Sequence, residues 1–470
     1  MSSSAEYWHG IGACELRPSF PAHTVQMRRS WPGRLQGLRA IVIAFGLIAF
    51  LVGGCAANGP QHPTITVHPA AGLFDQPVHL QITGLSPGES VTVQLSSVDD
   101  ESDLWSSHAT FSADGRGNLD LNHSPALSGS YHGVNPMGLV ESMQPASPAS
   151  ADTAYFWGSA PQRFTLTVTA AGSTVATKSF SRRGLSSGVS VQDETLRATG
   201  FYGQYWRPAP GSPRRPAVLE FGGSEGGLDG QLFGAGLASA GYPTLDIAYF
   251  DEPGLPAALH DIPLEYFARA LRWLARQPQV LPADIYVSGG SRGSEAALLL
   301  GVHYPNLVHG VIASSPSDIS FGAYPGPGAA WTFDGKPVPY SPTFSPTLPI
   351  VDPAADIAVQ DIRGPVFLDC GSADLIWTSC AYAAAIQDRL STARGRYPRV
   401  LYRYVGAGHL IDELIPYEPQ STSAINARGQ GDAPLANANA TANLWTHLLR
   451  FLAGPAIQSG TFTIPASPGQ

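Results

Sequence analysis

The chain has 470 residues, 43% of them hydrophobic, so it is long enough to bury a core in each of two or three structural units. Its formal net charge is −9 and its pI is near 5.8, and no basic stripe runs through the sequence. These values argue against a protein that binds nucleic acid, because such proteins cluster positive charge to meet phosphates.

Residues 1–60 are interpreted as a leader and linker rather than as part of the fold. Several arginines precede the apolar run "AIVIAFGLIAFLV" (40–52), whose length fits the hydrophobic region of a signal peptide and is short for a membrane span. Small residues then precede Cys55 in "LVGGC", as in the lipobox of bacterial lipoproteins. We expect an exported lipoprotein, anchored to the cell membrane through an acylated Cys55. An uncleaved anchor helix is the alternative, and a cytoplasmic location follows if the leader does not function.

Residues 61–182 have the pattern of β-structure. The stretch 65–98 alternates apolar and polar residues between Gly- and Pro-containing turns, and the pattern continues to about Phe180. Several short strands at this spacing predict an all-β, immunoglobulin-like sandwich. The stretch 124–145 is expected to form a long loop.

Residues 183–455 change to alternating strands and helices, clearly so from about Ala217, and 456–470 are expected to form a tail. This alternation predicts a mostly parallel sheet covered on both faces. The segment 321–353 is rich in Pro, Gly and aromatic residues and is interpreted as a lid or pocket rim, with a plain surface loop as the alternative. We expect strands at 216–221, 242–250, 284–289, 310–316, 365–371 and 399–405, and helices at 264–278, 293–304 and 442–454.

Three stretches fit G-x-S-x-G, the sharp turn that exposes a nucleophilic serine between a strand and a helix, and they centre on Ser186, Ser224 and Ser291. Ser291, in "VSGGSRGSEAALLLG", has a strand before it, a helix after it, and an acid and a histidine farther along the chain. Ser186 lies in a linker with no strand before it. We therefore interpret Ser291 as a nucleophile, against the alternative of a glycine-rich turn that binds nothing.

Two later strand ends supply the partners of this serine in the chain order of an α/β-hydrolase. Asp374 follows the strand at 365–371, and His409 follows the strand at 399–405. His447 also lies downstream, but in a predicted helix, where we expect it at the surface or packed. Ser291 would then attack an acyl carbon, His409 would carry the proton, and Asp374 would orient the imidazole.

The glycine-rich loop around Ser224 follows an earlier strand and is interpreted as part of an oxyanion hole. Glycine permits the backbone to approach a substrate closely, so we expect the amides of Gly223, Ser224 and Arg292 to face the developing negative charge. Arg214 and Arg215 are the cations expected near this loop if coenzyme A phosphates bind.

Cys370 and Cys380 would be the remaining cysteines of an exported chain that has lost its leader. Two thiols ten residues apart in an oxidising compartment predict a disulfide, with two buried free thiols as the alternative. No His or Cys companions stand at zinc spacing, so neither a metal nor a cofactor is predicted.

Four further stretches carry a family resemblance. They are "SPALSGSYHGVNPMGLVESMQP", "IPLEYFARALRWLARQPQV" followed by "VSGGSRGSE", "GSADLIWTS" with Asp374 and Trp377, and "GAGHLIDELIPY" with His409. With them, almost the whole chain beyond the leader resembles the acyl-CoA thioesterase / bile acid-CoA:amino acid N-acyltransferase family. The resemblance implies an N-terminal β-sandwich joined to an α/β-hydrolase. Family thioesterases use serine and the amino-acid transferases use cysteine, so Ser291 implies hydrolysis; Arg292 and Ser294 stand where lysine and glycine are commoner.

Three hypotheses follow for the function. The first is a serine-dependent acyl thioester hydrolase that releases a fatty acid through an acyl-enzyme. The second is an exported carboxylesterase or lipase acting on acyl esters, because an exported protein would not meet cytoplasmic acyl-CoA. The third is a non-catalytic lipid-binding lipoprotein. Acyl chain length, leaving group and oligomeric state stay open at this level.

Overall fold

A computed structural model describes residues 62–99, 102–146, 160–228, 230–393, 397–414, 416–417, 419, 434–454 and 458–466. The expected leader and Cys55 lie outside these residues. Within them, no helix is both long and apolar enough to cross a membrane.

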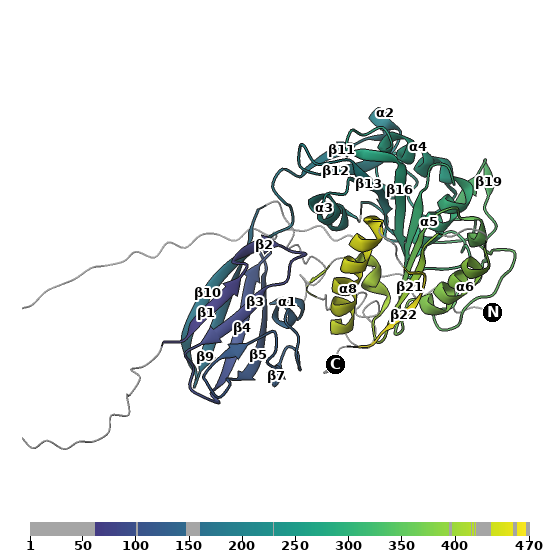
Figure 1. The fold of residues 1–470 in the computed structure, drawn as a ribbon. Helices are drawn as coiled ribbons and strands as arrows, with labels where there is room; N and C mark the ends of the chain where they lie inside the picture. The colour runs from purple at the N-terminus through teal and green to yellow at the C-terminus, as the bar shows by residue number, and fades with distance from the viewer. Residues whose placement is uncertain are drawn as a thin grey trace, which may run out of the picture. The chain divides into compact units, whose positions relative to one another are not determined.

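The region nearest the N-terminus is a β-sandwich of two sheets (Figure 1). Its elements are β1 (Thr64–His68), β2 (Ala71–Leu73), β3 (His79–Thr83), β4 (Ser90–Val98), β5 (Leu104–Ser112), β6 (Leu119–Asp120), β7 (Ser128–Gly129), α1 (Gly138–Glu141), β8 (Gln144–Pro145), β9 (Gln162–Ala170) and β10 (Ser173–Arg183). One sheet has the order β1-β3-β6 and the other β2-β10-β9-β4-β5-β7, with β8 beside β5.

The sandwich follows from the alternation in its strands. In β4, Val91, Val93 and Leu95 are buried while the residues between them are not, because successive side chains on a strand point to opposite faces. The predicted sandwich is therefore confirmed. The stretch predicted as one long loop also contains the short helix α1 and the short strands β7 and β8.

The second region is built on a large, mostly parallel sheet, as predicted. Its strands are β11 (Ser190–Glu194), β12 (Tyr202–Arg207), β13 (Arg215–Phe221), β14 (Thr244–Ala248), β16 (Val280–Gly290), β17 (Gly310–Ser314), β20 (Val366–Gly371), β21 (Arg399–Tyr404) and β22 (Gly460–Ile464). The order is β11-β12-β14-β13-β16-β17-β20-β21-β22, and all neighbours are parallel except β11–β12 and β12–β14.

Helices cover both faces of this sheet (Figure 1). Neighbouring strand residues alternate between two cores: Leu219 and Leu368 face one side, and Val218 and Phe367 face the other. The first side is covered by α4 (Leu264–Leu274), α5 (Arg292–His303) and α6 (Ser379–Thr392), and the second by α3 (Gln231–Ser239) and α8 (Pro434–Leu452). The α/β-hydrolase prediction is thus confirmed, and it brings the carboxyl ends of β13, β16, β17, β20 and β21 to one edge.

The structure corrects the expectation of a tail after residue 455. Within the described residues, Gly460–Ile464 forms β22, which pairs in parallel with Val400–Tyr404 of β21. The sequence "GTFTI" alternates and has high β-propensity, so it can extend an open sheet edge. The helices α3 and α6 were also not expected from the sequence pattern.

The segment 321–353 has little regular structure. Two short strands, β18 (Trp331–Phe333) and β19 (Lys336–Pro337), pair with each other, and β18 also pairs with β15 (Ile262–Pro263). Isolated bridges join Gly322 to Ala329 and Phe321 to Ser341.

Candidate active site

Ser291 lies on a strained turn between β16 and α5. Its φ is 50° and its ψ is −123°, a conformation that a residue with a side chain rarely adopts. The two flanking glycines are required for steric reasons: a Cβ at Gly289 would overlap the carbonyl of Gly293, and one at Gly293 would overlap the carbonyl of Gly222. This is the strand–turn–helix geometry that G-x-S-x-G needs to expose a serine.

His409 and Asp374 form a buried pair. The imidazole Nδ1 is 2.8 Å from Asp374 Oδ2, and the two side chains are only 6% and 2% exposed. The other carboxylate oxygen accepts the backbone N–H groups of Ile376 at 2.8 Å and Trp377 at 3.1 Å. Asp374 is therefore fixed in its loop, and a proton on Nδ1 directs Nε2 toward the role of proton acceptor.

The end of β17 connects the serine to the histidine. The backbone N–H of Ser291 donates to the carbonyl of Ser314 at 3.1 Å. The next residue, Ser315, donates its hydroxyl to the carbonyl of His409 at 2.8 Å, and its own carbonyl accepts the indole N–H of Trp377 at 3.0 Å. Neighbouring residues of one strand end thus hold all three predicted catalytic loops. Ser315 has no motif of its own in the sequence.

The loop predicted to supply the oxyanion hole lies against Ser291. A Cβ built on Gly223 would be 3.0 Å from the Cβ of Ser291, so a larger residue would push the loop and Ser291 apart by a few tenths of an ångström. The Tyr249 hydroxyl lies within hydrogen-bond distance of the carbonyls of Gly222 and Gly223 and shares its one proton between them, which holds the loop in place. Arg292 is the first residue of α5, where the first N–H groups lie beyond the hydrogen bonds of the helix.

The amide of Gly223 already has an acceptor in the structure. Its N–H donates to the carboxylate of Glu225, an exposed residue two positions along the loop. Glu225 was not expected to take part in the site. Because an amide N–H has one proton to share, a substrate oxyanion must displace this carboxylate before it can use the Gly223 donor. For the amide of Ser224, the described part of the chain shows no backbone hydrogen bond to Ser291.

A buried ion pair connects the turn at Ser291 to the segment 321–353. Arg292 Nε lies 2.7 Å from Glu295 Oε1, and the guanidinium also donates to the carbonyls of Phe321 and Gly322 at 3.0 and 2.8 Å. Glu295 Oε2 accepts the indole N–H of Trp331 at 2.9 Å and the N–H of Phe321 at 3.2 Å. Burial raises the pKa of Glu295, while Arg292 and these donors oppose that shift.

A disulfide closes the loop that carries Asp374. Cys370 is in β20, Cys380 is in α6, and their Cα atoms are 5.1 Å apart. The two ends of the loop that carries Asp374 are therefore joined covalently.

Two other sequence expectations concern residues outside the predicted triad. Arg215 begins β13, whereas the loop around Gly223 follows the other end of that strand. The prediction that Arg215 lies near this loop is therefore wrong. Seven residues of extended strand separate the two ends by roughly 20 Å. The guanidinium of Arg215 instead lies over the ring of Tyr242. His447 stacks on Tyr402, which confirms that it is packed.

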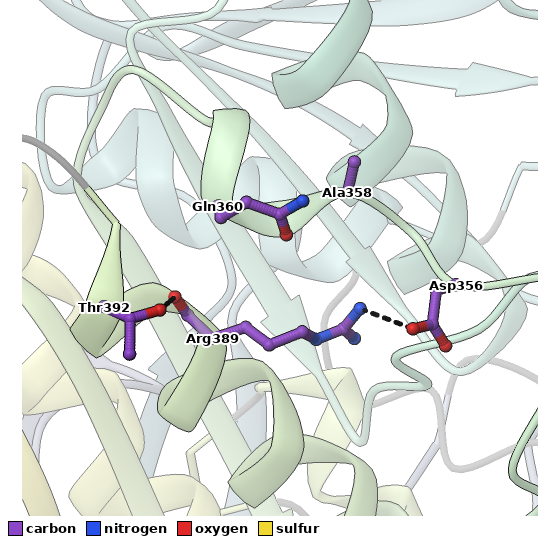
Figure 2. Close-up of a pocket in the computed structure, with 5 residues that line it drawn as sticks. All are labelled: Asp356, Ala358, Gln360, Arg389 and Thr392. Atoms are coloured by element: carbon purple, nitrogen blue, oxygen red, sulfur yellow. Dashed lines mark hydrogen bonds and ion pairs between the residues drawn. The ribbon is translucent and has the colours of Figure 1, made fainter. Parts of the chain in front are cut away.

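Figure 2 shows the residues around a surface cavity, and Ser291, Asp374 and His409 are not among them. The cavity has a volume of about 320 Å³. Arg389 of α6 lies across it, paired with Asp356 at 3.5 Å and with Asp318 at 2.9 Å. Because Arg389 is already paired and none of the lining residues belongs to the predicted catalytic loops, this cavity gives no reason to place a substrate there. The lining residues are Asp356, Ala358, Gln360, Arg389 and Thr392.

Two family models match this chain. The acyl-CoA thioester hydrolase/BAAT N-terminal region matches residues 75–195, and the BAAT / acyl-CoA thioester hydrolase C-terminal region matches residues 262–323 and 335–455. Together these cover more than half of the chain. The chain belongs to this family. Within the acyl-CoA thioester hydrolase/BAAT family match, Ser291, Asp374 and His409 all fall in the C-terminal region, whereas Gly223 falls between the two matched regions.

Similar proteins align with this chain over nearly their full length. The peroxisomal succinyl-coenzyme A thioesterase of Mus musculus is 29% identical, over 83% of this chain and 96% of that protein. The bile acid-CoA:amino acid N-acyltransferase of Mus musculus is 27% identical, with the same coverage of both chains. Acyl-coenzyme A thioesterase 2, mitochondrial, of Mus musculus is 28% identical, over 85% of this chain and 91% of that protein. Membership of this family and the α/β-hydrolase sheet support hydrolysis of a thioester or ester bond.

Proposed function

We propose that this chain hydrolyses acyl thioesters through an acyl-enzyme on Ser291. The observation that carries the proposal is the buried Asp374–His409 pair, held by the same strand end as the strained serine. The two similar relatives that are named as coenzyme A thioesterases support an acyl thioester as the substrate.

The first half of the reaction forms the acyl-enzyme. Ser291 Oγ attacks the acyl carbon, its proton passes to Nε2 of His409, and the carbonyl oxygen becomes an oxyanion. Asp374 stabilises the imidazolium that results, without itself taking the proton. When the C–S bond breaks, the thiolate leaves and takes the proton from His409.

The amides of Gly223 and Arg292 are the proposed donors to the oxyanion. Donors of this kind typically stabilise the transition state by about 3–4 kcal/mol each. Since Glu225 accepts the Gly223 N–H, part of that stabilisation is available only after the carboxylate has moved away.

The second half of the reaction uses water. His409 takes a proton from water as the water oxygen attacks the acyl carbon, and it then returns that proton to Ser291 Oγ when the bond from Oγ to the acyl carbon breaks and the fatty acid is released. Serine at position 291 favours water over an amine acceptor, because the transferases of this family use cysteine. A triad that opens thioesters also opens activated esters, so an esterase acting on acyl esters is the second candidate; the uncharged stretch 337–351 supports an apolar acyl group in both cases.

Turnover and labelling test the proposal. Purified protein should release free thiol from an acyl thioester and should bind a fluorophosphonate covalently. Ser291→Ala should abolish both, whereas Ser186→Ala, a matched change in a second G-x-S-x-G stretch, should keep both. Activity that survives in Ser291→Ala and is lost in Ser186→Ala would reverse the assignment of the nucleophile. No labelling of the unaltered protein would favour the non-catalytic lipid-binding alternative.

The leaving group is a separate question, because the leader favours export. We propose that the acyl group, more than coenzyme A, is recognised, and that Cys55 anchors the mature protein to the outer face of the membrane. A preference of more than about a hundredfold in kcat/KM for an acyl-CoA over the same acyl group on a small thiol would contradict the first point. Unchanged membrane association of Cys55→Ala would contradict the second.

A further inference from the structure

The carboxylate of Glu225 lies beside Ser291, in the proposed oxyanion hole. It accepts the N–H of Gly223, one of the two proposed donors. Glu225 Oε2 lies 3.1 Å from the point where a Cβ on Gly223 would stand, and the Cβ of Ser291 lies 3.0 Å from the same point. The two atoms can therefore be no farther apart than the sum of these distances. A negatively charged group occupies the donor that the proposed reaction needs for its own negative charge.

The loop that carries this carboxylate is also held by other contacts. The Tyr249 hydroxyl lies within hydrogen-bond distance of two carbonyls of the loop, and the N–H of Gly227 donates to the carbonyl of Phe250 at 3.1 Å. A Cβ at Gly226 would lie 2.7 Å from the Phe250 ring, so the loop packs closely on the residues that follow β14. Because these contacts already fix the loop, the hydrogen bond between its carboxylate and its own amide needs another explanation.

The hydrogen bond from Gly223 to Glu225 is strong enough to compete with a ligand and can still be broken. A hydrogen bond from a backbone N–H to a carboxylate is charge-assisted, and it is stronger than one to a neutral carbonyl oxygen. Glu225 is exposed, so its carboxylate can exchange the amide for water without being desolvated. It is also tethered two residues from Gly223, so it returns to the amide whenever a ligand leaves.

The product of the proposed reaction is itself a carboxylate. A fatty acid released by hydrolysis has the same kind of charged oxygen as Glu225 and can accept the same N–H. The thioester offers only a neutral carbonyl oxygen until Ser291 attacks it. Without a competitor, the Gly223 amide would therefore hold the product more tightly than the substrate.

We propose that Glu225 is a built-in competitor for the oxyanion hole, which keeps free carboxylates out, the fatty acid product among them. The inference rests on the proposed function and adds to it a residue that limits product inhibition. A group that occupies a donor weakens every ligand that needs this donor by one common factor. The same factor lowers kcat/KM, because attack on the thioester uses the same N–H.

Substitution of Glu225 tests both consequences together. The substrate is the octanoyl thioester of N-acetylcysteamine, and the inhibitor is octanoate. Glu225→Ala should raise kcat/KM about tenfold and lower the inhibition constant of octanoate by about the same factor, because both ligands regain the Gly223 N–H. Glu225→Gln keeps an oxygen acceptor without the charge, so it should change both values in the same directions and by less.

Glu252→Ala is the matched control, because it removes a carboxylate that borders another part of the same loop. Glu252 Oε1 lies 3.7 Å from the point where a Cβ on Gly227 would stand. Both values should stay as they are in the unaltered protein. Equal changes in Glu252→Ala, a change in only one of the two values in Glu225→Ala, no change there, or a lower kcat/KM there would overturn the proposal and leave the proposed function standing.

The Gly223 amide gives a readout that does not depend on turnover. In protein labelled with ¹⁵N-glycine, its NMR resonance is identified as one that disappears in Gly223→Ala. The amide proton should move upfield in Glu225→Ala, because a hydrogen bond to a carboxylate shifts such a proton downfield. Octanoate should move it back at a concentration about tenfold lower than the unaltered protein needs for saturation.

This readout separates the competitor from the reaction. If the unaltered protein hydrolyses no thioester but the Gly223 resonance responds to Glu225→Ala and to octanoate in this way, the proposed function fails and the competition for the amide holds. An amide proton at the same position in Glu225→Ala and in the unaltered protein would overturn the proposal.

Discussion

Replacing Gly223 by alanine should lower kcat by about a hundredfold while the protein stays folded. The added Cβ would lie 3.0 Å from the Cβ of Ser291, 3.1 Å from Glu225 Oε2 and 3.3 Å from the carbonyl oxygen of Gly290. Glu225 is exposed, whereas Ser291 and Gly290 belong to a turn packed between β16 and α5. The loop must therefore shift by a few tenths of an ångström, and the Gly223 N–H shifts with it.

The size of the effect follows from the role of that N–H. Losing one oxyanion donor costs about 3 kcal/mol in the transition state, which corresponds to roughly a hundredfold in kcat, with little change in KM. The φ of Gly223 is not positive, so alanine adds no backbone strain.

Thiol release from an acyl thioester measures kcat and KM, and thermal unfolding gives Tm. Gly115→Ala is the matched control, because a Cβ at Gly115 meets nothing within 4 Å. If Gly223→Ala keeps full kcat, the reasoning about the oxyanion loop is refuted. A large drop in its Tm would show that the substitution acts on the fold instead.

Three further predictions concern the groups around the site and in the sandwich. Glu295→Gln should lower the free energy of unfolding by denaturant by about 3 kcal/mol and should lower kcat/KM, because it leaves Arg292 partly uncompensated beside the turn at Ser291. Asp318→Asn, which alters an ion pair away from that turn, should leave kcat/KM unchanged, and equal effects of the two substitutions on activity would contradict this prediction. Reducing the Cys370–Cys380 disulfide should cost about 3 kcal/mol of stability, and identical unfolding curves with and without reductant would count against it. Burial raises the pKa of Glu141 from 4.5 to about 7. This carboxyl therefore contributes about 3 kcal/mol of stability below pH 4.5, and that contribution is lost as the pH rises through 7. Glu141→Gln should flatten this part of the pH–stability curve.

Local pattern determined much of the fold and the order of the catalytic loops. The alternation in 65–98 and the change to strand–helix alternation after Ala217 identify the two kinds of sheet, because side-chain periodicity follows directly from the geometry of strands and helices. A serine between glycines, with an acid and a histidine after later strands, identifies the triad candidates. Parallel strands bring such loops to one edge, so the chain order alone implied that they lie near one another.

Tertiary structure decided which other groups surround that edge. The carboxylate of Glu225 on the Gly223 amide and the Glu295 contacts to Phe321 and Trp331 have no motif, because their partners are chosen by loop shape and burial. The same holds for β22, which became a strand because the edge of β21 was open to it. Contacts such as Ser315 to His409 join residues 94 positions apart, and no periodicity along the chain encodes a distance of that kind.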